Sequence, residues 1–138
     1  PPLVVMAGGW CYVKEIVMPY YADDFVEIGC ACLIFDYRCF GDSDGLPRQH
    51  IDPWGQIEDY RNAVSFAKTL DEIDADRIGV WGISYSGGHA ICVAALDTRV
   101  KFAVSRPCVA VMASVSSRRS RNSFLTTARR VSAVSRVR

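Results

Sequence analysis

The sequence predicts an α/β fold, a three-layer αβα sandwich around a mostly parallel sheet. Four short apolar runs alternate with segments of helical periodicity, and glycine or other turn-forming residues separate them. Strands that alternate with helices of this length pair in parallel through right-handed crossovers, so helices cover both faces of the sheet. With 138 residues, half of them hydrophobic, the chain is long enough for one packed domain and too short for a second.

The first strand is predicted over residues 3–7, an unbroken apolar run that ends at Gly8 and Gly9. Such a run is typical of a parallel strand that is buried on both faces. A helix is predicted from Pro19, where proline favours a helix start, to Gly29. Its apolar residues recur at helical spacing: Tyr21, Phe25 and Ile28. Because an apolar strand begins almost at the first residue, we expect that the chain is entered partway through a fold.

A second strand is predicted over residues 30–37, and a dense cluster of turn-forming residues follows at 41–47. The next helix is predicted to open with Asp52 as its N-cap and Pro53 as its first residue. An apolar stripe marks its buried face: Ile57, Tyr60, Val64 and Ala67.

The same alternation continues after this helix. A third strand is predicted over residues 77–83, a helix of small residues over 86–96 and a fourth strand over 100–105. Beyond residue 107 the pattern dissolves into serine, arginine, valine, alanine and threonine. We therefore divide the chain into a core at residues 1–107 and a basic, Ser/Arg-rich tail at 108–138 that is expected to be disordered.

The strongest chemical signal lies between the third strand and the following helix, in the sequence Gly-Ile-Ser-Tyr-Ser-Gly-Gly at residues 82–88. A serine on a sharp strand-to-helix turn needs small residues two before it and two after it, because larger side chains would collide with the strand and the helix. Gly82 and Ser86 meet that need, and Gly87 relieves the next turn. The pattern indicates a nucleophile elbow with Ser84 as the nucleophile, and the alternative is a tight turn without chemistry. A phosphate-binding loop is disfavoured, because the segment lacks both the Gly-Lys-Ser/Thr ending and the Gly-x-Gly-x-x-Gly pattern.

Together with Phe-Asp-Tyr-Arg-Cys-Phe-Gly-Asp-Ser-Asp-Gly at residues 35–45, this turn resembles the α/β-hydrolase superfamily. The resemblance covers about residues 3–107 and points to the branch shared by Xaa-Pro dipeptidyl-peptidase-like hydrolases and fungal polyketide transferase-like or thiohydrolase-like proteins. It implies the N-terminal part of the α/β-hydrolase fold, with Ser84 as the nucleophile and the backbone N–H of Tyr85 as one oxyanion donor. The second implied donor is the N–H of Trp10, where the family has His-Gly-x and this chain has Gly-Gly-Trp.

Two positions depart from the family pattern. Gly8 stands where the family usually has histidine, and Cys39 stands where it usually has glycine. A cysteine at position 39 would be strained if this loop needs a positive φ.

The residues that would activate the serine are not found. A serine is a weak nucleophile unless a base takes its proton, and the family places its acid and its histidine on loops after later strands. His50 precedes Ser84 and His89 follows it by only five residues, so both histidines are expected to have packing or surface roles. Asp97 follows too soon to be the acid and is expected to be a solvated carboxylate at a helix end. We therefore predict very low turnover for this chain.

Other polar residues near the motifs have structural explanations. Asp36 and Arg38 are expected to pair with each other. Asp42, Ser43 and Asp44 are expected to form hydrogen bonds within their own turn.

Charge is distributed unevenly along the chain. Residues 1–105 carry all 15 acidic residues and 8 of the 16 basic ones, whereas residues 106–138 carry eight arginines and no acid. A basic tail binds polyanions without sequence specificity, and this one lacks interleaved aromatic residues, so nucleic acid is not expected as a partner. The tail is explained as a disordered extension or as sequence altered by a truncation or a change of reading frame.

The cysteines and the apolar segments suggest where the chain works. Six cysteines without a Cys-x-x-Cys pair predict reduced thiols and a cytoplasmic location. No segment has the pattern of a secretion signal or a membrane span, so no membrane partner is expected. The expected partner is a small-molecule acyl substrate, without metal or organic cofactor, and exposed sheet edges would allow self-association.

Two classes of function fit these observations. The first is a serine hydrolase that acts on an ester, thioester or amide through an acyl-enzyme at Ser84, with acyl or polyketide transfer as a variant of the same chemistry. The second is a truncated, non-catalytic fragment that persists as a binding or self-associating module.

Overall fold

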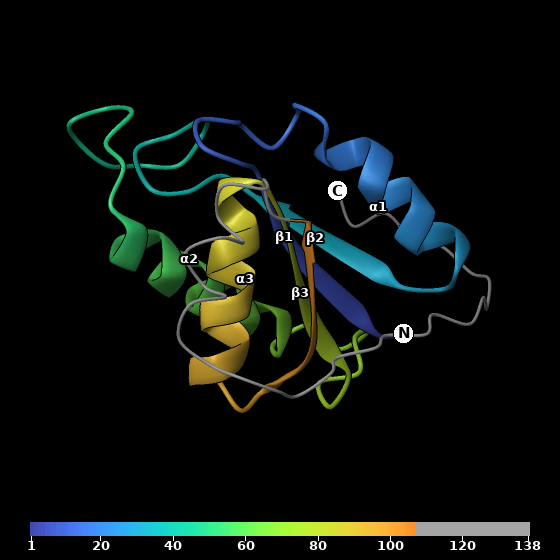
Figure 1. Cartoon of the computed structure of the whole chain (residues 1–138). Helices are drawn as coiled ribbons and strands as arrows, with labels where there is room; N and C mark the ends of the chain where they lie inside the picture. Colours follow the sequence, from blue (N-terminus) through green and yellow to red (C-terminus); the bar gives the residue numbers. More distant parts are fainter. Residues whose placement is uncertain (107–138) are drawn as a thin grey trace, which may run out of the picture.

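Strands and helices alternate along residues 1–106, the part of the chain that the computed structural model describes (Figure 1). The elements are β1 (Leu3–Ala7), α1 (Met18–Glu27), β2 (Ala31–Phe35), α2 (Pro53–Ala67), β3 (Ile78–Ile83), α3 (Tyr85–Leu96) and β4 (Val100–Arg106). Each element was predicted from the sequence, and every bound that was predicted lies within about two residues of the observed one; no end was predicted for α2. The predicted tail at residues 108–138 lies outside the described residues.

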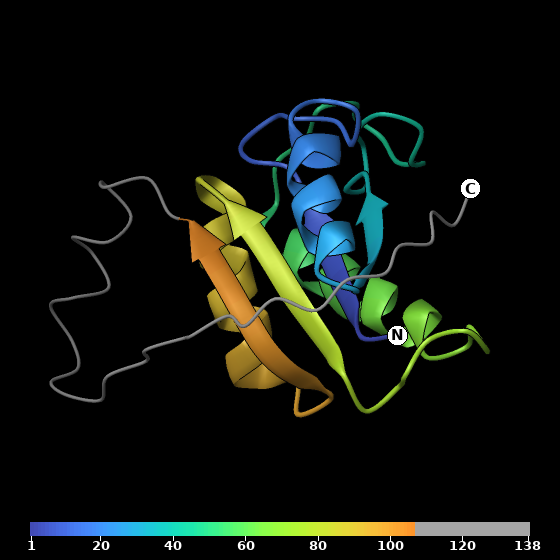
Figure 2. The ribbon, with the colours of Figure 1, turned by 90° about the vertical axis from the view of Figure 1, so that its right-hand side faces the viewer.

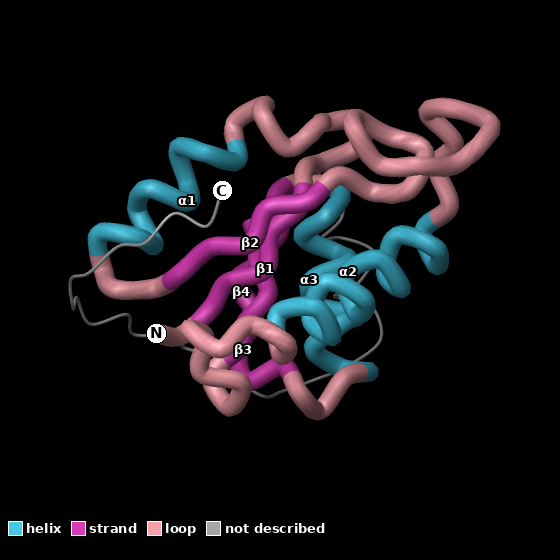
Figure 3. Tube along the Cα trace, turned by 180° about the vertical axis from the view of Figure 1, so that it is seen from behind, coloured by secondary structure: helices cyan, strands magenta, loops and turns pink. Residues whose placement is uncertain are grey.

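The strands form one parallel sheet in the order β2-β1-β3-β4. Val5 of β1 lies opposite Leu33 of β2 on one side and Val80 of β3 on the other. Figure 2 shows β3 and β4 side by side with their arrowheads pointing the same way. Seen from behind, α1 covers one face of the sheet while α2 and α3 cover the other (Figure 3). The predicted three-layer αβα architecture is confirmed.

The core consists of two apolar clusters, one on each face of the sheet. Leu3, Val5 and Ala7 contribute to the cluster beneath α2 and α3, whereas Val4 and Met6 contribute to the cluster beneath α1. All five residues of β1 are buried. The unbroken apolar run of this strand therefore follows from its central place, with helices on both sides.

The N-terminus of α2 forms as predicted. Asp52 is in an extended conformation, and its carboxylate accepts a hydrogen bond from the Trp54 N–H at 3.1 Å. Pro53 occupies the first helical position, where its missing N–H costs nothing. From this N-terminus, the buried stripe of α2, which includes Tyr60 and Val64, packs on the sheet.

Parallel strands place their carboxyl ends at one edge of the sheet. The segments after β1 and β2 and the turn after β3 therefore gather there, at the top of Figure 1. Open α/β sheets bind their ligands at this edge. No helix within residues 1–106 is both long enough and apolar enough to cross a membrane.

Candidate active site

Ser84 alone connects β3 to α3. The strand ends at Ile83, the helix begins at Tyr85, and Ser84 between them has φ 56° and ψ −118°. Its N–H donates to the Arg106 carbonyl of β4 at 2.8 Å, and its own carbonyl accepts from the Gly87 N–H at 3.1 Å. A non-glycine residue at positive φ is strained and persists only where its surroundings impose the conformation. The neighbouring strand and the first turn of α3 impose it here.

Small residues on either side make this turn possible. A Cβ added to Gly82 would overlap the Ser86 carbonyl oxygen, so only glycine fits. Ser86 is fully buried, and its Oγ accepts the Ile83 N–H at 2.8 Å and lies 3.0 Å from the Ala7 carbonyl oxygen. The hydroxyl group thus gives hydrogen-bond partners to the backbone of two strands, which explains why serine can occupy a position where glycine is usual.

Gly9, in the segment between β1 and α1, lies against Ser84. Residues 8–17, which the sequence analysis expected to supply an oxyanion donor, are called the oxyanion loop. A Cβ added to Gly9 would stand 3.4 Å from both Ser84 Cβ and the Ile83 carbonyl oxygen. The ring of Trp10 meets that of Tyr85 edge to face, with 4.9 Å between their centroids. The structure therefore brings together Trp10, Ser84 and Tyr85, the three residues that the sequence analysis assigned to the nucleophile and its oxyanion donors.

Tyr85 is the first residue of α3, so its N–H belongs to the first turn of a helix. The N–H groups of a first turn have no acceptor within the helix, and the helix dipole adds a partial positive charge there. An oxygen that gains negative charge beside Ser84 would be stabilised at such a position.

Tyr60 supports the site from beneath. Its hydroxyl group accepts the Ala7 N–H at 3.2 Å and donates to the Trp81 carbonyl at 2.8 Å, which joins the ends of β1 and β3. Burial raises the pKa of this hydroxyl well above its usual range, so it stays protonated. The sequence predicted Tyr60 only as part of an apolar stripe, because helical spacing carries no information on the contacts of a hydroxyl group.

His89 packs behind the turn. Its Nε2 lies 3.1 Å from Gln56 Oε1, so the imidazole and the amide form a buried side-chain hydrogen bond. The imidazole ring packs edge to face against Tyr85, with 4.5 Å between centroids, and burial lowers its pKa to about 4. This geometry agrees with the packing role expected for His89. His50 lies on the exposed loop before α2.

The predicted pairing of Asp36 with Arg38 is wrong. Both residues follow the end of β2, where the chain has left the sheet and side chains two residues apart no longer share a face. Asp36 turns inward and binds Lys14 of the oxyanion loop, with 2.8 Å between Oδ2 and Nζ. Arg38 turns outward and binds Asp59 of α2, with 2.7 Å between Nη2 and Oδ1.

The prediction of a solvated Asp97 is also wrong. Its side chain is only 4% exposed and accepts hydrogen bonds from Arg99, at 2.8 Å from Nε and 2.5 Å from Nη2. Arg61 of α2 adds an ion pair at 3.5 Å. The bonds from Arg99 are the main reason that the pKa of Asp97 falls to about 2. Arg61 is distant in sequence, so local spacing could not reveal this pairing.

The loop after β2 agrees in part with expectation. Ser43 Oγ donates to the Asp36 carbonyl at 2.7 Å, and the Asp44 carbonyl accepts the Cys39 N–H at 2.8 Å, so both make local turn bonds. Asp42 instead reaches Lys14 outside its own turn. Cys39 has φ 70°, which confirms that this position needs a positive φ.

The described residues hold free thiols and no grouping that suits a metal. Within residues 1–106, no three His, Cys, Asp or Glu side chains lie close enough together to bind an ion. The cysteines of this part of the chain are all free thiols: Cys11, Cys30, Cys32, Cys39 and Cys92. Cys108 lies outside the described residues.

Comparison with known proteins identifies the family. The family model described as X-Pro dipeptidyl-peptidase (S15 family) matches residues 2–127. The chain belongs to the S15 family. Its fold is part of the α/β-hydrolase fold, and the resemblance inferred from the two motifs is confirmed.

The relatives of this chain include proteins named as a thiohydrolase and as an acyltransferase. Thiohydrolase aneE of Aspergillus aculeatus is 48% identical over 104 residues, which are 75% of this chain and 33% of that protein. Acyltransferase drtE of Aspergillus calidoustus is 44% identical over 100 residues, 72% of this chain and 32% of that protein. The α/β hydrolase GrgF from Penicillium sp. sh18 superposes with a TM-score of 0.74 at 34% identity, covering 77% of this chain and 37% of that one. The chain therefore spans about a third of the length of these relatives.

Proposed function

We propose that Ser84 attacks the acyl carbon of an ester, thioester or amide and forms an acyl-enzyme. The observation that carries this proposal is the strained serine itself, placed under the oxyanion loop at the carboxyl edge of the sheet. Strain that surrounding contacts maintain at a half-buried turn is typical of a functional residue.

In the proposed reaction, Ser84 is the nucleophile, and two backbone N–H groups beside it stabilise the oxyanion. The Ser84 hydroxyl gives its proton to water as its oxygen bonds to the acyl carbon, and the carbonyl oxygen becomes an oxyanion. The N–H groups of Tyr85 and Trp10 stabilise that oxyanion, and each donor is worth roughly 3 kcal/mol of barrier lowering. The oxyanion then collapses and expels the alkoxide, thiolate or amine. The group that leaves takes up a proton from water. A thioester is favoured among these substrates because one S15 relative is named a thiohydrolase.

We propose that the 138-residue chain acylates but turns over slowly. Neither histidine is arranged as the base, since His89 bonds to Gln56 and His50 lies on an exposed loop. Without a base, an enzyme of this kind retains only the rate that oxyanion stabilisation and binding provide. On the strength of the free thiols, we also propose that the chain acts in the cytoplasm.

A fluorophosphonate probe tests the nucleophile. The serine oxygen bonds to phosphorus and fluoride leaves, so one labelling event needs no complete catalytic cycle. We expect labelling of the wild type at Ser84, none in Ser84→Ala, and wild-type labelling in Ser65→Ala, which alters an exposed serine of α2. Peptide mass spectrometry locates the adduct, and equal labelling of Ser84→Ala would overturn the proposal.

Acyl transfer is the second candidate, because another S15 relative is named an acyltransferase. The two reactions share the acyl-enzyme and differ in the acceptor, which is water or an alcohol. Incubation with a thioester and an added alcohol separates them, since hydrolysis yields the acid and transfer yields the ester. A chain that fails to acylate with any probe would instead be the non-catalytic fragment.

A further inference from the structure

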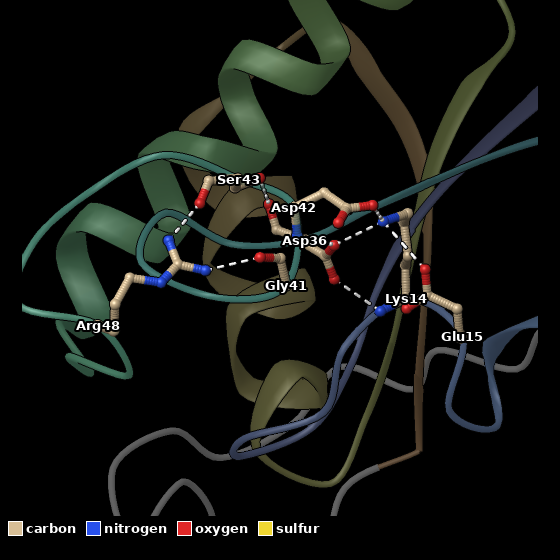
Figure 4. Close-up of polar contacts among 7 residues, drawn as sticks. All are labelled: Lys14, Glu15, Asp36, Gly41, Asp42, Ser43 and Arg48. Atoms are coloured by element: carbon tan, nitrogen blue, oxygen red, sulfur yellow. Dashed lines mark hydrogen bonds and ion pairs between the residues drawn. The ribbon is translucent and has the colours of Figure 1, made fainter.

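The Asp36 carboxylate is the centre of a hydrogen-bond network that joins two loops at the carboxyl edge of the sheet. Its side chain is only 2% exposed, and it lies directly after β2. Oδ1 accepts the Lys14 backbone N–H at 2.7 Å, and Oδ2 accepts Lys14 Nζ at 2.8 Å and the Asp42 N–H at 3.1 Å. Figure 4 shows this carboxylate between Lys14 on one side and Gly41 and Asp42 on the other.

The loop after β2 is shaped around this carboxylate. Gly41 has φ 48°, and a Cβ there would overlap the Asp36 carboxylate, so the backbone can approach only as glycine. Arg48 donates to the Gly41 carbonyl at 2.6 Å and also to the Ser43 carbonyl. These contacts hold the loop against Asp36 from the side opposite Lys14 (Figure 4). The contacts of the loop after β2 therefore fix the position of the Asp36 carboxylate without any contribution from Lys14.

Lys14 links the Asp36 carboxylate to the oxyanion loop, of which it is part. It lies four residues after Trp10 in the segment that connects β1 to α1. An exposed ion pair usually contributes little, but here the acceptor is buried and one of its bonds is to the backbone of the loop itself. Burial tends to raise the pKa of Asp36, yet the hydrogen bonds from Lys14 and Asp42 outweigh it and hold the pKa below its usual value. Asp36 thus remains a charged acceptor in neutral solution.

We propose that Asp36 is a positioning residue that, through Lys14, holds the oxyanion loop so that Gly9 stays against Ser84 and Trp10 against Tyr85. The inference rests on the proposed role of the Trp10 N–H as an oxyanion donor. One end of this loop is anchored at Ala7 in the sheet, and Lys14 anchors it on the far side of Trp10, through its Nζ at 2.8 Å as well as through its N–H at 2.7 Å. Donors are effective at about 2.7–3.1 Å from the oxyanion, and a displacement of about 1 Å can cost about a hundredfold in rate.

The first test measures fluorophosphonate labelling of Lys14→Met in the full chain, with the rate constant kinact and the encounter constant Ki determined separately. We expect kinact at Ser84 to fall about tenfold while Ki stays within about twofold, because the loop affects the reaction step more than the encounter. Lys14→Arg, which keeps a cation, should recover part of kinact. Arg77→Met is the matched control, since it removes an exposed ion pair with Asp74 at the opposite edge of the sheet.

The second test follows the loop itself and does not depend on reactivity. In protein labelled with fluorotryptophan, the Trp10 signal is assigned with Trp10→Phe and observed by fluorine NMR. We expect Lys14→Met to shift or broaden the Trp10 signal and to leave the signal of Trp81, which is buried in the core, unchanged. Arg77→Met should leave both signals unchanged.

The outcomes separate this inference from the proposed function. An unchanged kinact in Lys14→Met overturns the positioning role, whatever the Trp10 signal does. If the wild type is not labelled at Ser84, the proposed function fails, and the Trp10 signal alone decides whether Asp36 and Lys14 hold the loop. A Trp10 signal that is the same in Lys14→Met and the wild type overturns the inference in that case.

Discussion

At the scale of single residues, Ser84 has a conformation that a serine adopts only under constraint. Its φ of 56° and ψ of −118° are imposed by bonds to Arg106 on β4 and to Gly87 on α3. A conformation of this kind costs about 1–3 kcal/mol for a residue with a Cβ and much less for glycine. The fold therefore keeps a strained serine at this turn at a cost in stability.

Replacement of Ser84 by glycine is expected to make the protein more stable. Glycine relieves the strain but loses about 0.5–1 kcal/mol more backbone entropy on folding, so the net gain over Ser84→Ala should be about 1 kcal/mol. Urea denaturation measures this difference. The same change at Ser65, inside α2, should destabilise by about 1 kcal/mol, because glycine is a poor helix former and the hydrogen bond from Arg99 to Ser65 Oγ is lost. If Ser84→Gly lowered the free energy of unfolding as much as Ser65→Gly does, the backbone of Ser84 would not be strained.

How far the site could be predicted depends on the distance of each partner along the chain. The serine and its small neighbours form a local pattern, so the position of Ser84 followed from the sequence. The bonds of Asp36 did not, because Lys14 is 22 residues away and a lysine in a loop has no distinctive spacing. The roles of Arg61 at Asp97 and of the Tyr60 hydroxyl were missed for the same reason.

At the scale of elements, the sequence was sufficient, because apolar periodicity, proline at helix starts and glycine at helix ends are local signals. The sequence did not show which side chains form contacts between elements. Arg99 lies between α3 and β4, where it binds Asp97, and it also reaches Ser65 Oγ at 2.7 Å and the Arg61 carbonyl at 3.2 Å on α2. One side chain thus connects the fourth strand to a helix more than 30 residues earlier.

Arg99→Met is expected to destabilise the fold by about 2 kcal/mol, since it leaves the buried Asp97 carboxylate without its main partner. The pKa of Asp97 is lowered from 3.8 to about 2 in the folded protein. The stability that it contributes is therefore complete above about pH 4 and is lost as the pH falls towards 2.

The difference in free energy of unfolding between Arg99→Met and the wild type should therefore become smaller as the pH falls from about 4 towards 2. Urea denaturation at a series of pH values measures it. Lys101→Met, which alters an exposed lysine of β4, is the control and should follow the wild type. A difference in stability that stays constant from pH 5 to pH 2 would show that the Asp97 charge is not involved.

At the scale of the whole molecule, the sheet has open edges. Within residues 1–106, β2 and β4 each pair on one side only. The Ala31 N–H donates to the Pro2 carbonyl on the β1 side, and alternate residues of a strand face alternate sides. The N–H groups of Cys32 and Ile34 therefore point to the open side of β2, where they can pair with another strand.

We expect the 138-residue chain to self-associate, so that size-exclusion chromatography with light scattering gives a mass above the 15.3 kDa of one chain. Cys32→Pro removes an outward N–H and should shift the population towards the monomer while the fold is retained. Leu33→Pro removes an N–H from the ladder with β1 and should unfold the protein instead. A monomeric wild type, or an unchanged mass in Cys32→Pro, would contradict association through this edge.

The pairing of β1 with β3 has a consequence for how this protein can vary. Ala7 lies opposite Gly82, so the oxyanion loop and the serine turn leave the sheet at the same level, two residues before Ser84. A slip of one residue between these strands would move the loop by about 3.3 Å and turn every side chain of β1 to the opposite face. Insertions should therefore be tolerated in the connection between α2 and β3, which lies at the other edge of the sheet, and not within either of these strands. The register of β1 and β3 therefore sets the distance between the oxyanion loop and Ser84.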